Sequence, residues 1–522
     1  AQLRADPRLN AGRIFRSCVS ACASRRKDTE LPILTFPFDN TFARLPARFY
    51  SRLNPTPVSA PQLIRLNTQL ADELGLDPEA LASPGGLNVL AGNEVPISAQ
   101  PLAMVYAGHQ FGNWVSRLGD GRAILLGEMI DRNGVRRDIQ LKGAGRTPFS
   151  RMGDGRAVLG PVLREYIVSE AMTALGIPST RALAAVTTGE RIFRETTLPG
   201  AILTRVASSH VRVGTFQFYA ARKDTDALRA LSDYVIDRHY PLAAQQEQPY
   251  RALLDAVIAA QARLVARWML VGFIHGVMNT DNMSIAGETI DYGPCAFMDA
   301  YHPGMVFSSI DQAGRYAYGN QPSVAHWNLT RFAQALLPII EGGQDNALAS
   351  AQDAVDAFPG LYQSEWFAGM CRKLGLHEAH ASHPALVDDL LRLMADSGAD
   401  FTLTFRRLLD AAEPDTGSTV FATQFADKDA IEEWLTRWRR QLAEQAISSE
   451  KRSATMRAAN PAYIPRNHRI EEVIEAALAA DFQPFEKLMQ VLATPFEDQP
   501  EHDQYFNPPR PDQIVPATYC GT

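Results

Sequence analysis

Two short segments in the second half of the chain carry side chains that can hold a metal ion and take up a proton. The first, His-Gly-Val-Met-Asn-Thr-Asp-Asn, covers residues 275–282, and the second, Ile-Asp-Tyr-Gly, covers residues 290–293. The amide oxygen of Asn282 and the carboxylate of Asp291 are hard oxygen ligands, which Mg²⁺ prefers. Asp281 is a second carboxylate, and a carboxylate can accept the proton of a reacting hydroxyl group. The two segments therefore predict a site for a metal-bound phosphate compound.

The order of these residues is similar to the catalytic and metal loops of protein-kinase-like phosphotransferases. In those enzymes a catalytic Asp stands two residues after the His, an Asn follows in the same loop, and a later Asp holds magnesium. Here the residue two after His275 is Val277, which can take no proton. We therefore assign Asp281 as the candidate base, with Asn282 and Asp291 as the metal pair. A structural role for Asp281, in which its side chain caps the loop by accepting backbone N–H groups, is the alternative.

A glycine-rich turn, a lysine and a glutamate precede these loops in the order that a kinase-like small lobe requires. Gly119 and Gly121 let the backbone approach phosphate oxygens without a Cβ in the way. Lys142 ends the second strand of a predicted hairpin, and Glu165 lies on the following predicted helix, where it can pair with the lysine. Each feature alone is ordinary, since a lone lysine is usually a solvated charge. The order of all of them indicates a phosphate-binding lobe.

Arg205 and Arg212 flank the Ser-Ser-His sequence at 208–210, on the last predicted strands of this lobe. Guanidinium groups fork onto phosphate oxygens, so two additional arginines here would hold a phosphate chain in a deeper pocket than a kinase needs. Taken by themselves, they are better explained as surface arginines.

Two of the five cysteines suggest a redox link. Cys295 stands four residues after Asp291, and Cys520 stands third from the end on a tail that could reach it. A disulfide between them would hold the tail over the site. Two unrelated thiols are the alternative.

The bulk composition narrows the class of protein. Apolar residues make up 46% and charged residues 21%, and the formal net charge is −7, so no general attraction to nucleic acid or anionic membranes is expected. No apolar run reaches the roughly 18 residues that a membrane span needs. An odd number of scattered cysteines favours a reducing compartment. We expect a cytoplasmic, monomeric protein that binds neither nucleic acid nor membrane.

The first 30 residues stand apart because they are arginine-rich. They are either an organelle-targeting leader, or a flexible basic tail or extra residues upstream of the natural start. The short apolar patches favour the second interpretation over a leader.

Periodicity predicts strands followed by helices. An Asn-Gly turn between apolar runs at 123–127 and 138–142 indicates a hairpin, residues 159–175 have a helical pattern, and a helical stretch is expected at 61–76. From residue 228 to about 492 the pattern is mostly helical. The predicted divisions are a basic segment (1–30), an N-terminal extension (31–100), a small lobe (101–220), a helical large lobe with the catalytic and metal loops (221–492) and a C-terminal tail (493–522).

Together these stretches resemble the selenoprotein O family of kinase-fold proteins, over residues 31–522. The stretches that carry the resemblance are Tyr-Ala-Gly-His-Gln-Phe-Gly (106–112), the run from Gln-Leu-Lys-Gly (140–143) through Arg-Glu-Tyr (164–166), Ser-Thr-Arg-Ala-Leu (179–183), Val-Arg-Val-Gly-Thr-Phe (211–216), and the run from Asn-Thr-Asp-Asn (279–282) to Asp-Tyr-Gly-Pro (291–294).

The resemblance implies an α+β, protein-kinase-like bilobal fold and transfer of AMP from ATP to protein Ser, Thr or Tyr hydroxyls, with Mg²⁺ or Mn²⁺. It implies an inverted ATP, with the γ-phosphate buried and the α-phosphorus facing the acceptor. Asp281 would be the proton acceptor, Asn282 and Asp291 the metal ligands, and Cys295 matches a family cysteine. The implied nucleotide-binding residues are Gly119, Gly121, Arg122, Lys142, Asp154, Gly155, Arg205, Arg212 and Asp291.

Two rival functions remain open. Ordinary γ-phosphoryl transfer with Asp281 as a shifted base would give ADP. A non-catalytic nucleotide-binding protein, gated by Cys295 and Cys520, would bind ATP without turnover.

Overall fold

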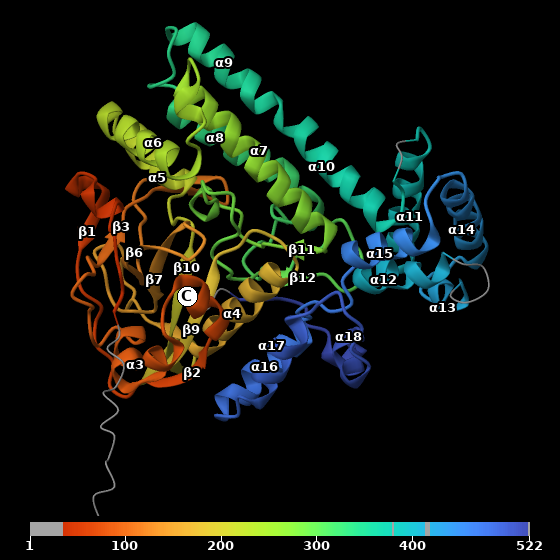
Figure 1. Cartoon of the computed structure of the whole chain (residues 1–522), viewed down its shortest axis with the longest axis horizontal. Coiled ribbons are helices and arrows are strands. Elements are labelled where there is room, and N and C mark those ends of the chain that lie inside the picture. The colour runs from red at the N-terminus through yellow and green to blue at the C-terminus, as the bar shows by residue number, and fades with distance from the viewer. Residues whose placement is uncertain (1–34, 378–379, 413–417, 520–522) are drawn as a thin grey trace, which may run out of the picture.

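The structure, a computed structural model, describes residues 35–377, 380–412 and 418–519. Figure 1 shows a sheet-rich part formed by the first part of the chain and a helical part formed by the rest. Two helices from near the end of the chain, labelled α16 (Asn467–Leu478) and α17 (Gln483–Leu492), lie next to the sheet-rich part again (Figure 1). The predicted α+β class, with strands preceding helices, is confirmed.

Eight strands of the described chain form one antiparallel sheet, with the order β1-β3-β6-β7-β10-β9-β2 and with β8 paired to β10. The hairpin predicted around the Asn-Gly turn is confirmed as β6 (Ala123–Ile130) and β7 (Arg136–Lys142). Its register sets Ala123 opposite Lys142, so the glycine-rich turn that enters β6 lies beside the end of β7. The other strands of the sheet are β1 (Tyr50–Arg52), β2 (Gln62–Leu66), β3 (Leu102–Met104), β8 (Ala157–Val158), β9 (Arg181–Phe193) and β10 (Thr197–Ala207).

The N-terminal extension forms both edges of this sheet, because β1 and β2 are its two outermost strands. The helix predicted at 61–76 is wrong in its first part: residues Gln62–Leu66 are a strand that pairs with β9, and helix α1 begins only at Thr68. Pairing with a strand more than a hundred residues away overrides the local helical pattern. The helices of the extension are α1 (Thr68–Leu74), α2 (Pro78–Ala82) and α3 (Pro84–Leu90).

Alternation along β6 sends successive side chains into two cores on opposite faces of the sheet. Leu125 belongs to the larger core, which includes the apolar side of helix α4 (Leu159–Ala174). Ile124 and Leu126 belong to a smaller core with Leu70 of the extension. Both faces of the sheet are therefore covered, which keeps the strands that carry the site rigid.

Helix α4, predicted at 159–175, is held from outside by two helices from near the end of the chain. The helices α16 and α17 pack against it. Arg164 of α4 forms an ion pair with Glu471 of α16. The ring of Tyr166 meets Phe485 edge-on at a centroid distance of 5.4 Å. The position of α4 is therefore fixed by helices that lie about 300 residues further along the chain.

The helical part carries the two segments that contain Asp281, Asn282 and Asp291. They lie in irregular chain around the short strands β11 (Phe273–Ile274) and β12 (Ala296–Phe297), with one turn of 3-10 helix, η4 (Thr280–Asn282). No helix among the described residues is long and apolar enough to cross a bilayer. The helices of this part are α5 (Val213–Ala220), α6 (Thr225–His239), α7 (Pro249–Leu270), α8 (Gln321–Leu336), α9 (Gln344–Asp356), α10 (Phe358–Lys373), α11 (His383–Ser397), α12 (Phe401–Ala411), α13 (Ser418–Ala422), α14 (Lys428–Ala443), α15 (Ser449–Ala459) and, near the end, α18 (Asp503–Phe506).

Candidate active site

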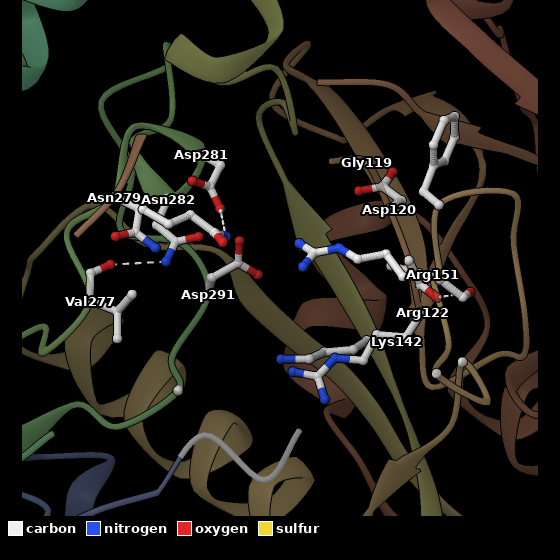
Figure 2. Close-up of a pocket in the computed structure, with 18 of the residues that line it drawn as sticks. Gly119, Asp120, Arg122, Lys142, Arg151, Val277, Asn279, Asp281, Asn282 and Asp291 are labelled. Carbon is white, nitrogen blue, oxygen red and sulfur yellow. Dashed lines mark hydrogen bonds between the residues drawn. The ribbon is translucent and has the colours of Figure 1, made fainter. Parts of the chain in front are cut away.

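A cavity of about 690 Å³ lies between the sheet-rich and helical parts. Figure 2 shows Lys142 and Arg122 on one side of it and Asp281, Asn282 and Asp291 on the facing side. Every residue predicted to bind the nucleotide, hold the metal or accept the proton lines this cavity. These residues are Gly119, Gly121, Arg122, Lys142, Asp154, Gly155, Arg205, Arg212, Asp281, Asn282 and Asp291.

The lysine of β7 meets the glutamate of α4 behind the cavity. Lys142 Nζ donates a hydrogen bond to one carboxylate oxygen of Glu165, and Arg205 Nε donates to the other at 2.5 Å. Burial, reinforced by the neighbouring Arg205, lowers the pKa of Lys142 to about 8. The predicted pair is therefore brought together. An anion that enters the cavity would stabilise the charged form of the lysine, which burial disfavours.

Two guanidinium groups converge on Asp291. Arg205 donates to Asp291 Oδ1 at 2.8 Å, and Arg212 donates to Oδ2 and also, at 2.7 Å, to the backbone oxygen of Asp281. Both arginines are almost completely buried, so the interpretation of them as surface residues is wrong. Burial alone would raise the pKa of Asp291, but Arg212, Arg205 and Lys142 hold it well below its usual value. The carboxylate is therefore ionised and already in contact with two cations.

Asp281 is a carboxylate with little compensation for its burial. It is 6% exposed, and among the described residues its Oδ1 has no hydrogen-bond partner. Its Oδ2 accepts one hydrogen bond, from Gln110 Nε2 at 3.1 Å. Burial raises the pKa of Asp281 to about 6, although Gln110 and Arg212 act in the opposite direction. A loop cap would accept several backbone N–H groups, whereas this carboxylate accepts one side-chain hydrogen bond, so its geometry does not match a cap.

The loop around Asp281 is tied to the segment that carries Asp291, and it has an apolar residue, Val277, two positions after His275. His275 is buried and its Nε2 lies 2.9 Å from the backbone oxygen of Ile290, which ties the two loops together. Val277 presents an apolar side chain to the cavity. Asn282 Nδ2 donates to the backbone oxygen of Val277 at 2.9 Å, which leaves its amide oxygen for another ligand.

The glycine-rich turn is shaped by its neighbours. Gly119 has a φ of 141°, and a Cβ there would lie 2.4 Å from the ring of Phe149. Asp120 faces inward and accepts a hydrogen bond from Met104 N at 3.0 Å. The turn therefore keeps open backbone at the cavity wall, as a phosphate-approaching loop requires.

The sequence Gly-Asp-Gly-Arg-Ala of the glycine-rich turn (119–123) occurs again at 153–157, where some residues line the cavity and one has a structural role. Gly155 lines the cavity, and Asp154 forms an ion pair with Arg194 at 2.8 Å on the rim. Arg156, in contrast, donates to the backbone oxygens of Thr56 and Pro57, at 3.0 Å each. Arg156 thus fastens the turn to the N-terminal extension, which is a structural role.

The protein oxygens at this site are too few to hold a divalent cation without further oxygens from a bound molecule. Among the described residues no group of three His, Cys, Asp or Glu side chains could hold a metal alone. Asn282 and Asp291 supply two oxygens, and Mg²⁺ commonly completes such a pair with phosphate oxygens and water. The donor set therefore suits a metal that arrives with a nucleotide.

The C-terminal tail reaches the segment that contains Cys295. Thr518 pairs with Ser308 in a parallel bridge, and its Oγ1 donates to the backbone oxygen of Pro294 at 2.6 Å. Cys295 itself is fully buried. Cys520 lies outside the described residues.

Sequence reasoning missed the partners that hold the predicted residues in place. Gln110 contacts Asp281 across 171 positions, and Tyr106 lies under Arg212, with the guanidinium carbon 4.6 Å from the ring centroid. Gly108 is needed because a Cβ there would lie 2.5 Å from Asp281 Oδ1. These three residues belong to one motif, residues 106–112, which was the available signal.

Comparison with known proteins places the chain in a family. The family model described as "Protein adenylyltransferase SelO" matches residues 32–493. Proteins named "Protein nucleotidyltransferase YdiU" from Bradyrhizobium diazoefficiens and Rhodopseudomonas palustris are 61% and 60% identical to the chain over 488 residues, which is 93% of this chain and 99% of theirs. One from Methylorubrum populi is 61% identical over 495 residues, with the same coverage. The chain belongs to the SelO family of protein adenylyltransferases.

Proposed function

We propose that this protein transfers AMP from Mg²⁺-bound ATP to Ser, Thr or Tyr hydroxyls of proteins, with Asp281 as the proton acceptor. Family membership establishes protein nucleotidyl transfer, with ATP as the nucleotide that it implies. The observation that carries the finer proposal is the convergence of Arg205 and Arg212 beside Lys142, deep in the cavity. Three cations there match a buried triphosphate end, which turns the α-phosphorus toward the acceptor.

The reaction is one displacement at the α-phosphorus. The acceptor oxygen forms a bond to the α-phosphorus, the bond from that phosphorus to the bridging oxygen breaks, and pyrophosphate leaves with the bond electrons. The hydroxyl proton passes to the carboxylate of Asp281, whose pKa of about 6 suits a base near neutral pH. Arg205, Arg212 and Lys142 stabilise the charge on the departing pyrophosphate.

The metal site also supports this assignment. Mg²⁺ or Mn²⁺, held by Asn282 and Asp291, would neutralise the phosphate charges and orient the nucleotide. Asp291 must then give up at least one of its contacts to Arg205 and Arg212. The phosphates are the natural replacement partners for these guanidinium groups.

We propose further that the fold is protein-kinase-like. The support is the order of its parts: a glycine-rich turn, the β7 lysine paired with the α4 glutamate, and the two loops that carry Asn282 and Asp291. In a kinase-like alignment of these parts Val277 occupies the position of the kinase base, and the chemistry has moved to Asp281.

Redox control is the second proposal for this site. The support is the contact of Thr518 with Pro294, the residue before Cys295. In the sequence, Cys520 comes two residues after Thr518. A disulfide between the two cysteines would fix the tail across the segment that follows Asp291.

Paired incubations with ATP labelled at the α- or the γ-phosphate test the main proposal. We expect label on a protein acceptor from α-labelled ATP only. Label from γ-labelled ATP only would make the protein a kinase with a relocated base. Label from neither, in the presence of reductant, would leave nucleotide binding without turnover.

A further inference from the structure

A small hairpin, outside the main sheet, crosses the loop that carries Asp281. Its strands are β4 (Gly108–Gln110) and β5 (Asn113–Val115). Besides the contact from Gln110 to Asp281, the backbone N–H of His109 donates to Thr280 Oγ1 at 2.7 Å. Gln110 lines the cavity, whereas Trp114, on the other strand, is 42% exposed. The hairpin therefore connects the wall beside Asp281 with the outer surface.

Aromatic and basic side chains gather on the outer side of this hairpin. The ring of His109 lies 5.0 Å from that of Trp114 and 5.3 Å from that of Trp327, on helix α8. The guanidinium carbons of Arg315 and Arg331 lie 4.8 and 4.7 Å from the centroid of Trp327. We call these five residues the arginine–tryptophan surface.

The positive charges of the two arginines on this surface are not paired with carboxylates of the described chain. Among the described residues neither Arg315 nor Arg331 forms an ion pair, and the Nε atom of each is buried without a hydrogen-bond partner. Asp311 is only four residues from Arg315, but its carboxylate does not pair with the guanidinium group. It accepts hydrogen bonds from the backbone N–H groups of Arg315 and Tyr316. Burial and these two arginines lower the pKa of His109, so the histidine does not add a positive charge at neutral pH.

Arg315 is also close to the cavity. Its guanidinium carbon lies 3.5 Å from the position that a Cβ on Gly112 would occupy, only two residues from Gln110. Its neighbour Tyr316 donates to Asn279 Oδ1, inside the loop of Asp281, at 2.6 Å. An acceptor chain with its hydroxyl at Asp281 would therefore pass within reach of Arg315.

We propose that the arginine–tryptophan surface binds the acceptor protein and selects segments in which carboxylates flank the hydroxyl. This inference rests on the proposed transfer to protein hydroxyls. Stacked guanidinium groups on tryptophan are held in place, so they lose little conformational freedom when a carboxylate binds. The site has two arginines in a compact cluster on a chain of net charge −7, which suits an acidic segment of a protein better than the continuous phosphate track of a nucleic acid.

The test compares two peptides that each contain one tyrosine, flanked by glutamates in one and by glutamines in the other. AMP transfer from α-labelled ATP is measured with reductant present, for wild type, for Arg315→Gln/Arg331→Gln and for Arg132→Gln. Arg132 is an exposed arginine on the β6–β7 turn and serves as the matched control. Binding of each peptide is measured separately by fluorescence anisotropy, at low and high salt.

For wild type and Arg132→Gln we expect a lower KM and tighter binding for the glutamate peptide, and weaker binding at high salt. In the double variant the KM of that peptide should rise about tenfold, as expected for the loss of two ion pairs made by half-buried surface arginines. The KM of the glutamine peptide should not change, which also shows that the variant is folded. A Lys pair at these positions should recover part of the preference.

Equal use and equal binding of the two peptides by wild type would overturn this inference and leave the proposed function intact. The inference also fails if the double variant keeps the preference. It fails too if, in the same anisotropy assay, wild type binds a labelled oligonucleotide more tightly than the glutamate peptide and the double variant loses that binding. No label on any acceptor would refute the proposed function, while the anisotropy arm would still decide whether the surface binds acidic segments.

Discussion

Replacing Asp281 by Asn separates the catalytic role of its carboxylate from its role in folding. The amide keeps the shape of the side chain and can still accept the hydrogen bond from Gln110. General bases contribute about 10²–10⁴ in rate, so AMP transfer should fall by that factor, or about 3–5 kcal/mol in the barrier. In wild type, kcat/KM should rise with pH through about 6, the pKa that burial gives Asp281, and Asp281→Asn should lack this limb.

The effect on stability should have the opposite direction. Burial raises the pKa of Asp281 from 3.8 to about 6, so the folded protein binds this proton more tightly than the unfolded chain does. Stability is therefore lost as the pH rises from 3.8 to about 6, and above this window the buried charge costs about 3 kcal/mol at most. The Asn variant escapes this cost. At pH 8 it should be more stable than wild type, and the difference should vanish as the pH approaches 4.

Urea unfolding at pH 8 and at pH 4.5, beside the label-transfer assay, measures both effects. Asp353→Asn, a change at an exposed carboxylate on α9, controls for the loss of one negative charge. If Asp281→Asn were less stable than wild type at pH 8, its carboxylate would be a structural cap rather than a poised base. If transfer fell less than tenfold, the proton would be leaving by another route.

The remaining predictions concern the phosphate and metal groups and the tail. Lys142→Met should reduce kcat/KM for ATP by about 10²–10³, with the circular dichroism spectrum unchanged; an unaffected rate would remove the lysine from the site. Calorimetry should show that Mg²⁺ binds at least about tenfold more tightly with a non-hydrolysable ATP analogue than alone, because phosphate frees Asp291 from Arg212. Equal Mg²⁺ affinity with and without the analogue would contradict this. The activity of wild type should rise with reductant and that of Cys520→Ala should not; a wild type that ignores reductant would disprove the link to Cys295.

Local signals predicted the elements that carry the site. The Asn-Gly turn fixed the β6–β7 hairpin and hence the position of Lys142, and the helical periodicity of 159–175 placed Glu165 on the next element. The pairing of these two side chains follows from the likeness of that order to a kinase small lobe. It is present in the structure.

Long-range partners could not be predicted in the same way. The contact of Gln110 with Asp281 depends on how two distant loops meet, and nothing in either loop encodes the other. The strand Gln62–Leu66 is similar: it forms because β9 offers an unpaired edge, whereas its own sequence also suits the start of a helix. Both depend on tertiary structure rather than on sequence pattern.

The clamped position of α4 has a consequence for inhibitor design. Moving this helix outward would break the ion pair of Arg164 with Glu471 and expose the packed rings of Tyr166 and Phe485. A compound that works by wedging open a space behind such a helix would have to displace α16 and α17 first. Small molecules are therefore better sought among those that occupy the end of the cavity lined by Arg205 and Arg212, where an anionic compound would meet two guanidinium groups without moving α4.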